Sequence, residues 1–179
     1  MTNYEFSLKP FRSEKELNPR RVTGRVSEKD GRLNFNIKIL GSLTGLAIPL
    51  HESAPERRNR LWEETCFEFF LVLPGDGRYW EFNLSPAGHW NVFCFEKYRQ
   101  GMQEEAAVHS LPFSIRKDWN MVSLSLGFDL TLLIPLQTHF KMAVSSVLQE
   151  QTGQTTFWAL SHPAANPDFH HRDSFLIVF

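Results

Sequence analysis

Residues Leu61–Phe95, LWEETCFEFFLVLPGDGRYWEFNLSPAGHWNVFCF, decide the fold of this chain. Three largely apolar runs, over 66–73, 78–85 and 91–96, are separated by PGDG and PAGH, and Pro- and Gly-rich tetrapeptides of this kind form turns. Each run has the length of a strand, and the turns between them are short. The spacing therefore predicts three consecutive antiparallel strands.

The two faces of the middle strand differ in polarity, because successive side chains alternate between the faces of a strand. One face carries Trp80, Phe82 and Leu84, and the other carries Tyr79, Glu81, Asn83 and Ser85. We expect Leu73 to pair with Arg78. This register places Glu68 opposite Asn83 and diagonal to Glu81, so that two carboxylates and a carboxamide share one face.

The polar face suits a hydroxyl-rich ligand, because the aromatic residues Trp62, Tyr79 and Trp90 lie near its carboxylates and carboxamide. An ordinary solvated outer face would show the same alternation, since antiparallel sheets commonly have one. The pattern alone leaves both interpretations open.

Most of the remaining chain also has the alternation of half-buried strands. Further runs occupy 4–9, 22–26, 33–39, 121–128, 139–149, 155–162 and 174–179. Asp30-Gly31 is a hairpin turn pair, and Asp129 is placed to cap a short helix over 129–133. Nine to eleven strands with short turns predict one all-β domain over 1–179, an antiparallel β-sandwich of about ten strands, immunoglobulin-like or jelly-roll-like, with minor helix.

Composition and charge exclude some classes of partner. The chain has 19 basic and 20 acidic residues and a net charge of −1, which argues against nucleic-acid and anionic-membrane binding. The short basic cluster Glu56–Arg60, ERRNR, is expected to be a solvated loop. Because 16 of the 179 residues are Phe, we expect an aromatic-rich core.

The N-terminal residues and the cysteines indicate a reducing compartment. No charged start followed by an apolar run is present, and no run of about 18 apolar residues occurs. A cytoplasmic location is expected unless a leader has been removed. Cys66 and Cys94 are expected to be reduced thiols without a metal, both on the face of Glu68 and Glu81.

Catalytic motifs are few. The chain contains no phosphate loop, dinucleotide fingerprint or nucleophile elbow. Diagonal neighbours in a sheet lie about 7–8 Å apart, which is compatible with the paired acids of some glycoside hydrolases. Glu68 and Glu81 therefore keep a hydrolase as an alternative.

Histidine and methionine residues offer two further alternatives. His162, His170 and His171 lie near Asp168, but their spacing matches no standard zinc site, so a structural loop is favoured and no metal is expected. Haem needs axial ligands such as His or Met. The available candidates are His89, Met102, His109 and Met142.

The chain resembles the DOMON-like superfamily, in particular its branch related to family 9 carbohydrate-binding modules. The resemblance spans most of the chain and is clearest in LWEETCFEFFL, YWEFNLSPAGHWNVFCFEKYRQGM and FWALSHPAANPDFHHRDSF. It is similar to small bacterial members of unassigned role. The resemblance implies a β-sandwich of roughly ten strands that binds sugar or haem and is not catalytic.

The resemblance also implies a set of binding residues. In the sugar-binding modules two aromatic rings clamp a terminal sugar, and a carboxylate six residues after the first ring bonds its hydroxyls. Trp62 and Glu68 stand at that spacing, and Asn166 and Phe169 match the second half of the motif, shortly before Phe175. Phe169 departs from the family's Trp, which weakens stacking. The neighbouring His170 and His171 could add donors.

The sequence therefore predicts a protein that binds a small molecule, with a sugar as the first candidate, and is not an enzyme. The predicted ligand-binding residues are Trp62, Glu68, Glu81, Asn83, Asn166, Phe169, His170 and His171. Haem binding is the first alternative; a glycoside hydrolase and a protein-interaction module follow. No oligomeric state follows from the sequence.

Overall fold

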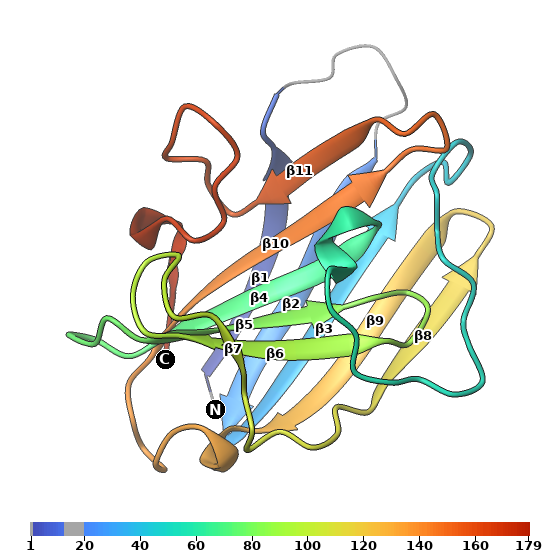
Figure 1. Cartoon of the computed structure of the whole chain (residues 1–179). Helices are drawn as coiled ribbons and strands as arrows, with labels where there is room; N and C mark the ends of the chain where they lie inside the picture. The colour runs from blue at the N-terminus through green and yellow to red at the C-terminus, as the bar shows by residue number, and fades with distance from the viewer. Residues whose placement is uncertain (1, 13–19) are drawn as a thin grey trace.

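The computed structural model describes residues 2–12 and 20–179, and these residues form antiparallel strands with short 3-10 turns (Figure 1). The strands are β1 (Thr2–Pro10), β2 (Arg21–Lys29), β3 (Arg32–Leu40), β4 (Cys66–Val72), β5 (Tyr79–Leu84), β6 (Trp90–Phe95), β7 (Gln103–Glu104), β8 (Phe113–Asp118), β9 (Met121–Asp129), β10 (Lys141–Gln149), β11 (Thr155–Ala159) and β12 (Ile177–Val178). The 3-10 turns are η1 (Leu61–Glu63), η2 (Leu130–Leu132) and η3 (Arg172–Ser174). No helix in the described ranges is long and apolar enough to span a membrane.

The strands form two layers joined along one edge (Figure 1). One layer, here called the site sheet, has the order β7-β6-β5-β4-β10-β11, with β12 also paired to β10; the other, the back sheet, has the order β1-β2-β3-β9-β8. Strand β1 connects them, because Thr2–Leu8 pairs with β2 while Lys9 and Pro10 pair with β11. This arrangement confirms the predicted antiparallel β-sandwich.

The predicted meander and its register are confirmed. Strands β4, β5 and β6 are sequential neighbours, and Val72 pairs with Tyr79. Glu68 lies opposite Asn83, and Phe70 lies opposite Glu81. The two carboxylates therefore occupy diagonal positions on the same face of the site sheet.

Phenylalanine rings fill the space between the two sheets. The ring of Phe69 lies 4.2 Å from that of Phe82 and 4.8 Å from that of Phe35 in the back sheet, measured between centroids. Phe82 also meets Phe128 edge-on at 5.0 Å. Burying one such side chain stabilises the fold by about 1.5–3 kcal/mol. The predicted inward residues Phe67, Phe69, Trp80, Phe82 and Leu84 are all buried.

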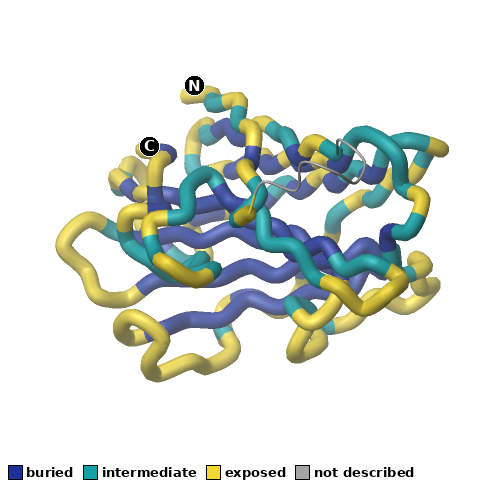
Figure 2. The backbone as a smooth tube through the Cα atoms, turned by 90° about the horizontal axis from the view of Figure 1, so that it is seen from above, coloured by how far each residue is buried: buried dark blue, intermediate teal, exposed yellow. Residues whose placement is uncertain are grey.

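The outer face of the site sheet is buried as well, and is not a solvated face. A second apolar cluster there contains Phe70, Val72, Tyr79, Phe93, Phe95, Ala143 and Phe175, with Trp62 and Phe169 packed against it. Every residue of β4, β5 and β6 is buried (Figure 2). The strands of this meander are therefore covered on both faces, and their polar residues lie inside the protein.

One cysteine lies on the face opposite to the predicted one. Cys94 pairs with Trp80 and belongs to the core between the sheets, whereas Cys66 lies on the outer face with Glu68. The reason is the turn between β5 and β6, in which the Ser85 N–H donates to the His89 carbonyl at 2.9 Å. This pairing sets the register that sends Cys94 inward. Both cysteines are buried and unbonded to each other.

The basic cluster Glu56–Arg60 is also more buried than predicted at one position. The Arg57 guanidinium lies 4.5 Å from the centroid of the Trp90 ring and donates to Asn91 Oδ1 at 2.9 Å. It also donates to the carbonyls of Glu105 and Val108. Arg57 therefore fastens the long segment 41–60 to the site sheet, and the expectation of a wholly solvated loop is wrong here.

The predicted helix after β9 is confirmed in shortened form. Asp129 caps η2, and its side chain accepts a hydrogen bond from the Thr131 N–H at 3.0 Å. The predicted strand over 174–179 is shorter in the structure, because His171 caps the turn η3 and Ser174 lies within it. Only Ile177–Val178 remain as β12.

Candidate functional site

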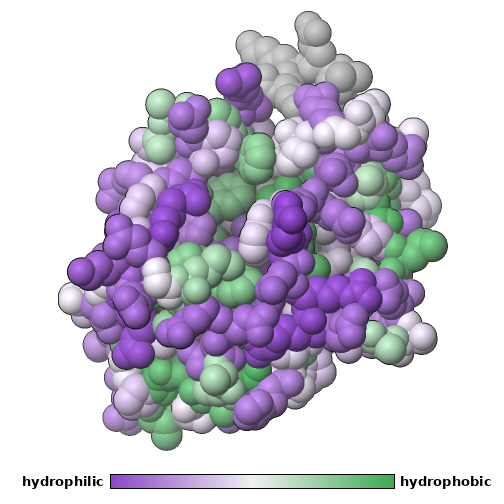
Figure 3. Space-filling view, in the orientation of Figure 1, coloured by the Kyte–Doolittle hydropathy of each residue, from purple (hydrophilic) through white to green (hydrophobic). Residues whose placement is uncertain are grey.

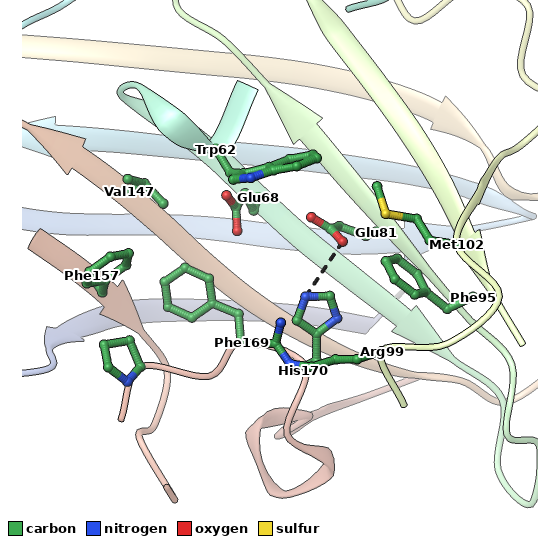
Figure 4. A pocket seen from close by; sticks show the side chains of 11 residues that line it. Trp62, Glu68, Glu81, Phe95, Arg99, Met102, Val147, Phe157, Phe169 and His170 are labelled. Atoms are coloured by element: carbon green, nitrogen blue, oxygen red, sulfur yellow. Dashed lines mark ion pairs between the residues drawn. The ribbon is translucent and has the colours of Figure 1, made fainter. Parts of the chain in front are cut away.

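A cavity of about 500 Å³ lies on the outer face of the site sheet, beneath the loops that cover it (Figure 4). The lining residues are Trp62, Glu68, Glu81, Phe95, Arg99, Met102, Val147, Phe157, Pro167, Phe169 and His170. In the space-filling view a recessed apolar area is bordered by hydrophilic residues (Figure 3). Strands β4, β5, β6, β10 and β11 supply the floor, and loops supply the rim.

Two buried carboxyl groups form the polar floor of the cavity. Glu68 and Glu81 are 2% and 5% exposed. The Ser145 hydroxyl donates to Glu68 Oε2 at 3.1 Å, and the Asn83 amide donates to Glu81 Oε1 at 2.9 Å. Glu68 Oε1 is buried and has no hydrogen-bond partner among the described residues. A buried polar atom without a partner is costly, and the Glu68 side chain lines the cavity.

Burial shifts the pKa of both carboxyl groups upward. Desolvation raises the pKa of Glu68 well above its ordinary value, and the nearby charge of Glu81 raises it further, against the hydrogen bond from Ser145. Desolvation also raises the pKa of Glu81 to about 7, although Asn83 and Arg99 favour its ionised form. The two groups therefore hold at least one proton near neutral pH, and together they can both donate and accept hydrogen bonds.

Aromatic rings form the walls. Trp62 projects from η1, a turn that begins after Arg60 in the left-handed conformation (φ 61°), and its ring meets Phe93 edge-on at 5.8 Å. Phe169 projects from the loop before η3 and lies 6.1 Å from Phe157 of β11. Trp62 and Phe169 thus line the same cavity, on either side of the carboxyl floor (Figure 4).

His170 is a neutral side chain in the wall of the cavity. Desolvation lowers its pKa to about 4, and the charge of Arg99 lowers it while that of Asp168 raises it. The Tyr79 hydroxyl accepts the Arg99 N–H at 3.1 Å and lies 2.7 Å from His170 Nδ1. We assign the Tyr79 hydroxyl as the donor to His170 Nδ1. The proton of the neutral imidazole is then on Nε2, which lies 3.8 Å from Glu81 Oε2 (Figure 4).

Asp168 holds the two rim loops together. Its carboxylate accepts hydrogen bonds from the Tyr98 hydroxyl, from the Arg99 guanidinium at 2.8 Å and from the His170 N–H at 3.1 Å. Partial burial raises the pKa of Asp168, but these hydrogen bonds outweigh it and the net shift is downward. The loop 97–102 is thereby joined to the loop that carries Phe169 and His170.

The predicted site residues fall into two groups. Trp62, Glu68, Glu81, Phe169 and His170 line the cavity. Asn83 lies below it and orients Glu81. Asn166 is exposed and does not line the cavity, and His171 caps η3 through Nδ1, which accepts the Asp173 N–H. The involvement of Asn166 and His171 in binding stays a prediction.

Six lining residues were not predicted from the sequence: Phe95, Arg99, Met102, Val147, Phe157 and Pro167. One signal was available for Phe95, because β6 carries apolar residues on both faces, which is typical of a strand buried on both sides. The loop that carries Arg99 and Met102 has no periodic pattern. Its position depends on the contacts with Asp168.

The haem and metal candidates are dispersed. Of the four haem candidates only Met102 lines the cavity. His89 is buried in the turn before β6, where Nδ1 accepts the Glu56 N–H, and Met142 lies in the core between the sheets. Among the described residues no three His, Cys, Asp or Glu side chains form a group that could hold a metal ion.

Known structures share this fold. No protein-family model matches the chain, and no curated protein matches it. A crystal structure of a candidate carbohydrate-binding protein from Bacteroides uniformis ATCC 8492 superposes with a TM-score of 0.68 at 15% identity, covering 96% of this chain and 84% of that one. A family 9 carbohydrate-binding module from Caldicellulosiruptor kristjanssonii, in complex with cellotriose, gives a TM-score of 0.53 at 10% identity, covering 89% and 74%. The fold is therefore one that carbohydrate-binding proteins use.

Proposed function

We propose that this chain binds a sugar, without transforming it, between Trp62 and Phe169. The observation that carries the proposal is Glu68 Oε1, a buried oxygen without a partner among the described residues, on a side chain that lines an aromatic-walled cavity. A sugar hydroxyl, which can both donate and accept, would supply the missing partner. The aromatic rings would cover the apolar C–H faces of the sugar, as in other small-molecule sites.

The fold similarity supports the same ligand class. The module from Caldicellulosiruptor kristjanssonii was solved with cellotriose bound, and its fold resembles this one. The resemblance of the sequence to DOMON-like proteins points the same way. Fold alone does not establish function, so the proposal depends on the cavity and its residues.

Each predicted site residue has a role in this proposal. Glu68 and Glu81 bond hydroxyls from below, and Asn83 orients Glu81. His170 presents its Nε2–H to the cavity beside Glu81. Asn166, exposed near the rim, is proposed to contact the outer edge of the ligand, together with His171.

A hydrolase is the second candidate, because two carboxyl groups in one cavity both have raised pKa values. A general acid needs a raised pKa, but its partner must be ionised to act as base or nucleophile. Turnover of chromogenic glycosides that disappears in Glu81→Gln would replace the binding proposal with this one. Haem binding would instead show as a strong Soret absorption in the purified protein.

Replacing Trp62 tests the proposal. Trp62 is part of the cavity wall and not of the core between the sheets, so Trp62→Ala should keep the fold. Loss of its stacking area should weaken sugar binding by about 10- to 100-fold. Binding is measured by isothermal titration against mono- and oligosaccharides, with circular dichroism as the check on folding.

Trp119→Ala is the matched control, because Trp119 is 87% exposed beyond the end of β8 and lies outside the cavity lining. It should bind like the wild type. The proposal is refuted if the wild-type protein binds no saccharide, or if Trp62→Ala binds as tightly as Trp119→Ala.

A further inference from the structure

We propose that the ligand of this cavity carries a protonated amine, so that an amino sugar binds more tightly than its neutral counterpart. The inference rests on the proposed function and deepens it by naming the class of sugar. It is carried by the arrangement of charges, free acceptor oxygens and rings around Glu68 and Glu81.

The cavity floor contains two acidic groups and no cation that is bonded to either. The hydrogen bonds to Glu68 and Glu81 come from Ser145 and Asn83, which are neutral. Among the described residues that line the cavity, Arg99 is the only one with a permanent positive charge. A buried carboxylate is normally paired, so ionisation of Glu68 or Glu81 calls for a positive partner, and none of the described residues bonds to either group as a cation.

Neither nearby basic residue supplies that charge. The Arg99 guanidinium donates to Asp168 at 2.8 Å, so its charge is already paired at the rim. His170 Nε2 lies 3.8 Å from Glu81 Oε2, too far for a hydrogen bond. His170 is also neutral there, because burial lowers its pKa to about 4. With Arg99 and Asp168 paired at the rim, the charge that remains is that of whichever carboxyl group of Glu68 and Glu81 ionises, and a bound ammonium group would favour that ionised form.

The number of free acceptor atoms favours an ammonium group over a hydroxyl. Among the described residues, Glu68 Oε1 has no hydrogen-bond partner. Glu81 Oε2 accepts no hydrogen bond from them either, since its neighbour His170 Nε2 is 3.8 Å away. In Figure 4 the Glu68 carboxyl group lies between Trp62 and Phe169, and the Glu81 carboxyl group lies between Trp62 and His170. A hydroxyl has one hydrogen to donate, whereas an ammonium group has three. One ammonium group therefore carries enough donors for both oxygens.

The aromatic walls are compatible with a cation as well as with a sugar ring. Trp62 and Phe169 line the cavity on either side of the carboxyl floor, with Phe95 and Phe157 nearby. Ring faces attract cations, and Trp does so most strongly. The combination of several rings and unpaired carboxylates is the chemistry that recognises organic ammonium groups.

Matched pairs of sugars test the inference. Glucosamine and glucose, galactosamine and galactose, and mannosamine and mannose each differ in one group. Affinities are measured by isothermal titration at about pH 6.5, where an amine is protonated. We expect the amino member of the preferred pair to bind about tenfold more tightly, because a hydrogen bond between charged groups is stronger than a neutral one.

Isosteric variants locate the preference. In Glu68→Gln and Glu81→Gln the tenfold ratio should fall to about threefold or less, because each substitution removes one carboxyl group that can ionise against the ammonium. Glu104→Gln is the matched control, since its carboxylate lies outside the cavity lining, and it should keep the full ratio. Thermal melts confirm that the variants are folded.

The outcomes separate the two proposals. Equal affinity within every pair, or tighter binding of the neutral member, overturns the amine inference and leaves sugar binding intact. A tenfold preference that persists in both Gln variants also overturns it. If no member of any pair binds, the amine inference is overturned; if no oligosaccharide binds either, the proposed sugar binding is overturned as well.

Discussion

Glu81 shows how surroundings change the chemistry of a residue. Its carboxyl group is covered by the rim loops and bonded to Asn83. Desolvation raises its pKa from an ordinary value of 4.5 to about 7, against the opposing effects of Asn83 and Arg99. A group that would be a plain anion on the surface is therefore close to half-protonated at neutral pH.

Stability should fall as Glu81 ionises. Below pH 4.5 both the folded and the unfolded states are protonated, and between 4.5 and about 7 the folded state holds the extra proton. The free energy of unfolding therefore decreases as pH rises through this window, by about 3 kcal/mol in total at about 1.4 kcal/mol per pH unit. Glu81→Gln removes the part of this dependence that Glu81 contributes, while Glu68, whose pKa burial also raises, keeps its own part.

Urea denaturation at about pH 5 and about pH 8 measures this pH dependence of the free energy of unfolding, because the two pH values span the window. The Glu81→Gln variant should be more stable than the wild type at the higher pH, and the difference should shrink at the lower one. Glu5→Gln, whose side chain is 81% exposed, should follow the wild type. A difference between Glu81→Gln and wild type that does not change with pH would contradict the assignment.

At the scale of single residues, the sequence predicted which polar side chains share the site, but it did not predict that they are buried. Alternation placed Glu68, Glu81 and Asn83 on one face, and the register confirmed it. The proton held by the pair could not be predicted, because it depends on loops that cover the face. Cys94 was placed wrongly because a turn of different register reverses every side chain of the following strand.

At the scale of elements, the carboxylate of Asp168 joins the two rim loops directly, and the Tyr79 hydroxyl contacts both of them as well. Asp168 bonds Tyr98, Arg99 and the His170 backbone, which joins two loops that are about 70 residues apart. We expect Asp168→Ala to lower the free energy of unfolding by about 1–2 kcal/mol, because three donors lose their acceptor and only some regain one from water.

Hydrogen exchange distinguishes loosening of the loops from global destabilisation. In Asp168→Ala the amides of 98–101 and 168–171 should exchange faster, while those of β4 and β5 change far less. Asp118→Ala is the control, because Asp118 bonds only Arg116 at the exposed end of β8, at 3.1 Å, and such pairs contribute little. Unchanged loop exchange in Asp168→Ala would show that the rim is held by other contacts.

Most strands were predictable, whereas the strands β7 and β8 and the loops were not. Alternation over 33–39 and 121–128 matched β3 and β9 closely, because local pattern alone sets such strands. The segments 41–60 and 97–112 lack periodicity. Their courses depend on tertiary contacts such as those of Arg57, which no local pattern encodes.

At the scale of the whole molecule, the two sheets are held together by aromatic packing. Phe69 is fully buried, stacks on Phe82 and contacts Phe35 of the other layer. Phe69→Ala should lower the free energy of unfolding by about 3–5 kcal/mol, through lost transfer energy and the cavity left behind. Leu50→Ala, at an 82% exposed position, should change it by less than about 0.5 kcal/mol.

Urea denaturation, analysed with one m-value for all variants, measures the change in the free energy of unfolding for Phe69→Ala and for Leu50→Ala. A loss below about 1 kcal/mol in Phe69→Ala would contradict the packing between the layers, since fully buried Phe side chains cost more than that to remove. The sandwich itself was predictable, because many alternating strands with short turns have few ways to bury one face each. The burial of the outer face of the site sheet was not predictable, because loops cover that face.

The central claim is that a sugar binds over Glu68 beside Trp62, and the indole N–H resonances test it most directly. The chain has five Trp residues. Only Trp62 lines the cavity, Trp119 is 87% exposed, and the indole N–H of Trp80 donates to Glu105. A Trp62→Phe variant assigns the resonance of Trp62.

Titration of the protein with glucosamine, followed by ¹H–¹⁵N NMR, should shift the Trp62 indole resonance progressively to saturation. The resonances of Trp119 and Trp80 should stay in place, because neither ring faces the cavity. If the Trp62 resonance does not move with glucosamine or with any neutral sugar of the panel, or if Trp119 responds in its place, the cavity over Glu68 is not the binding site.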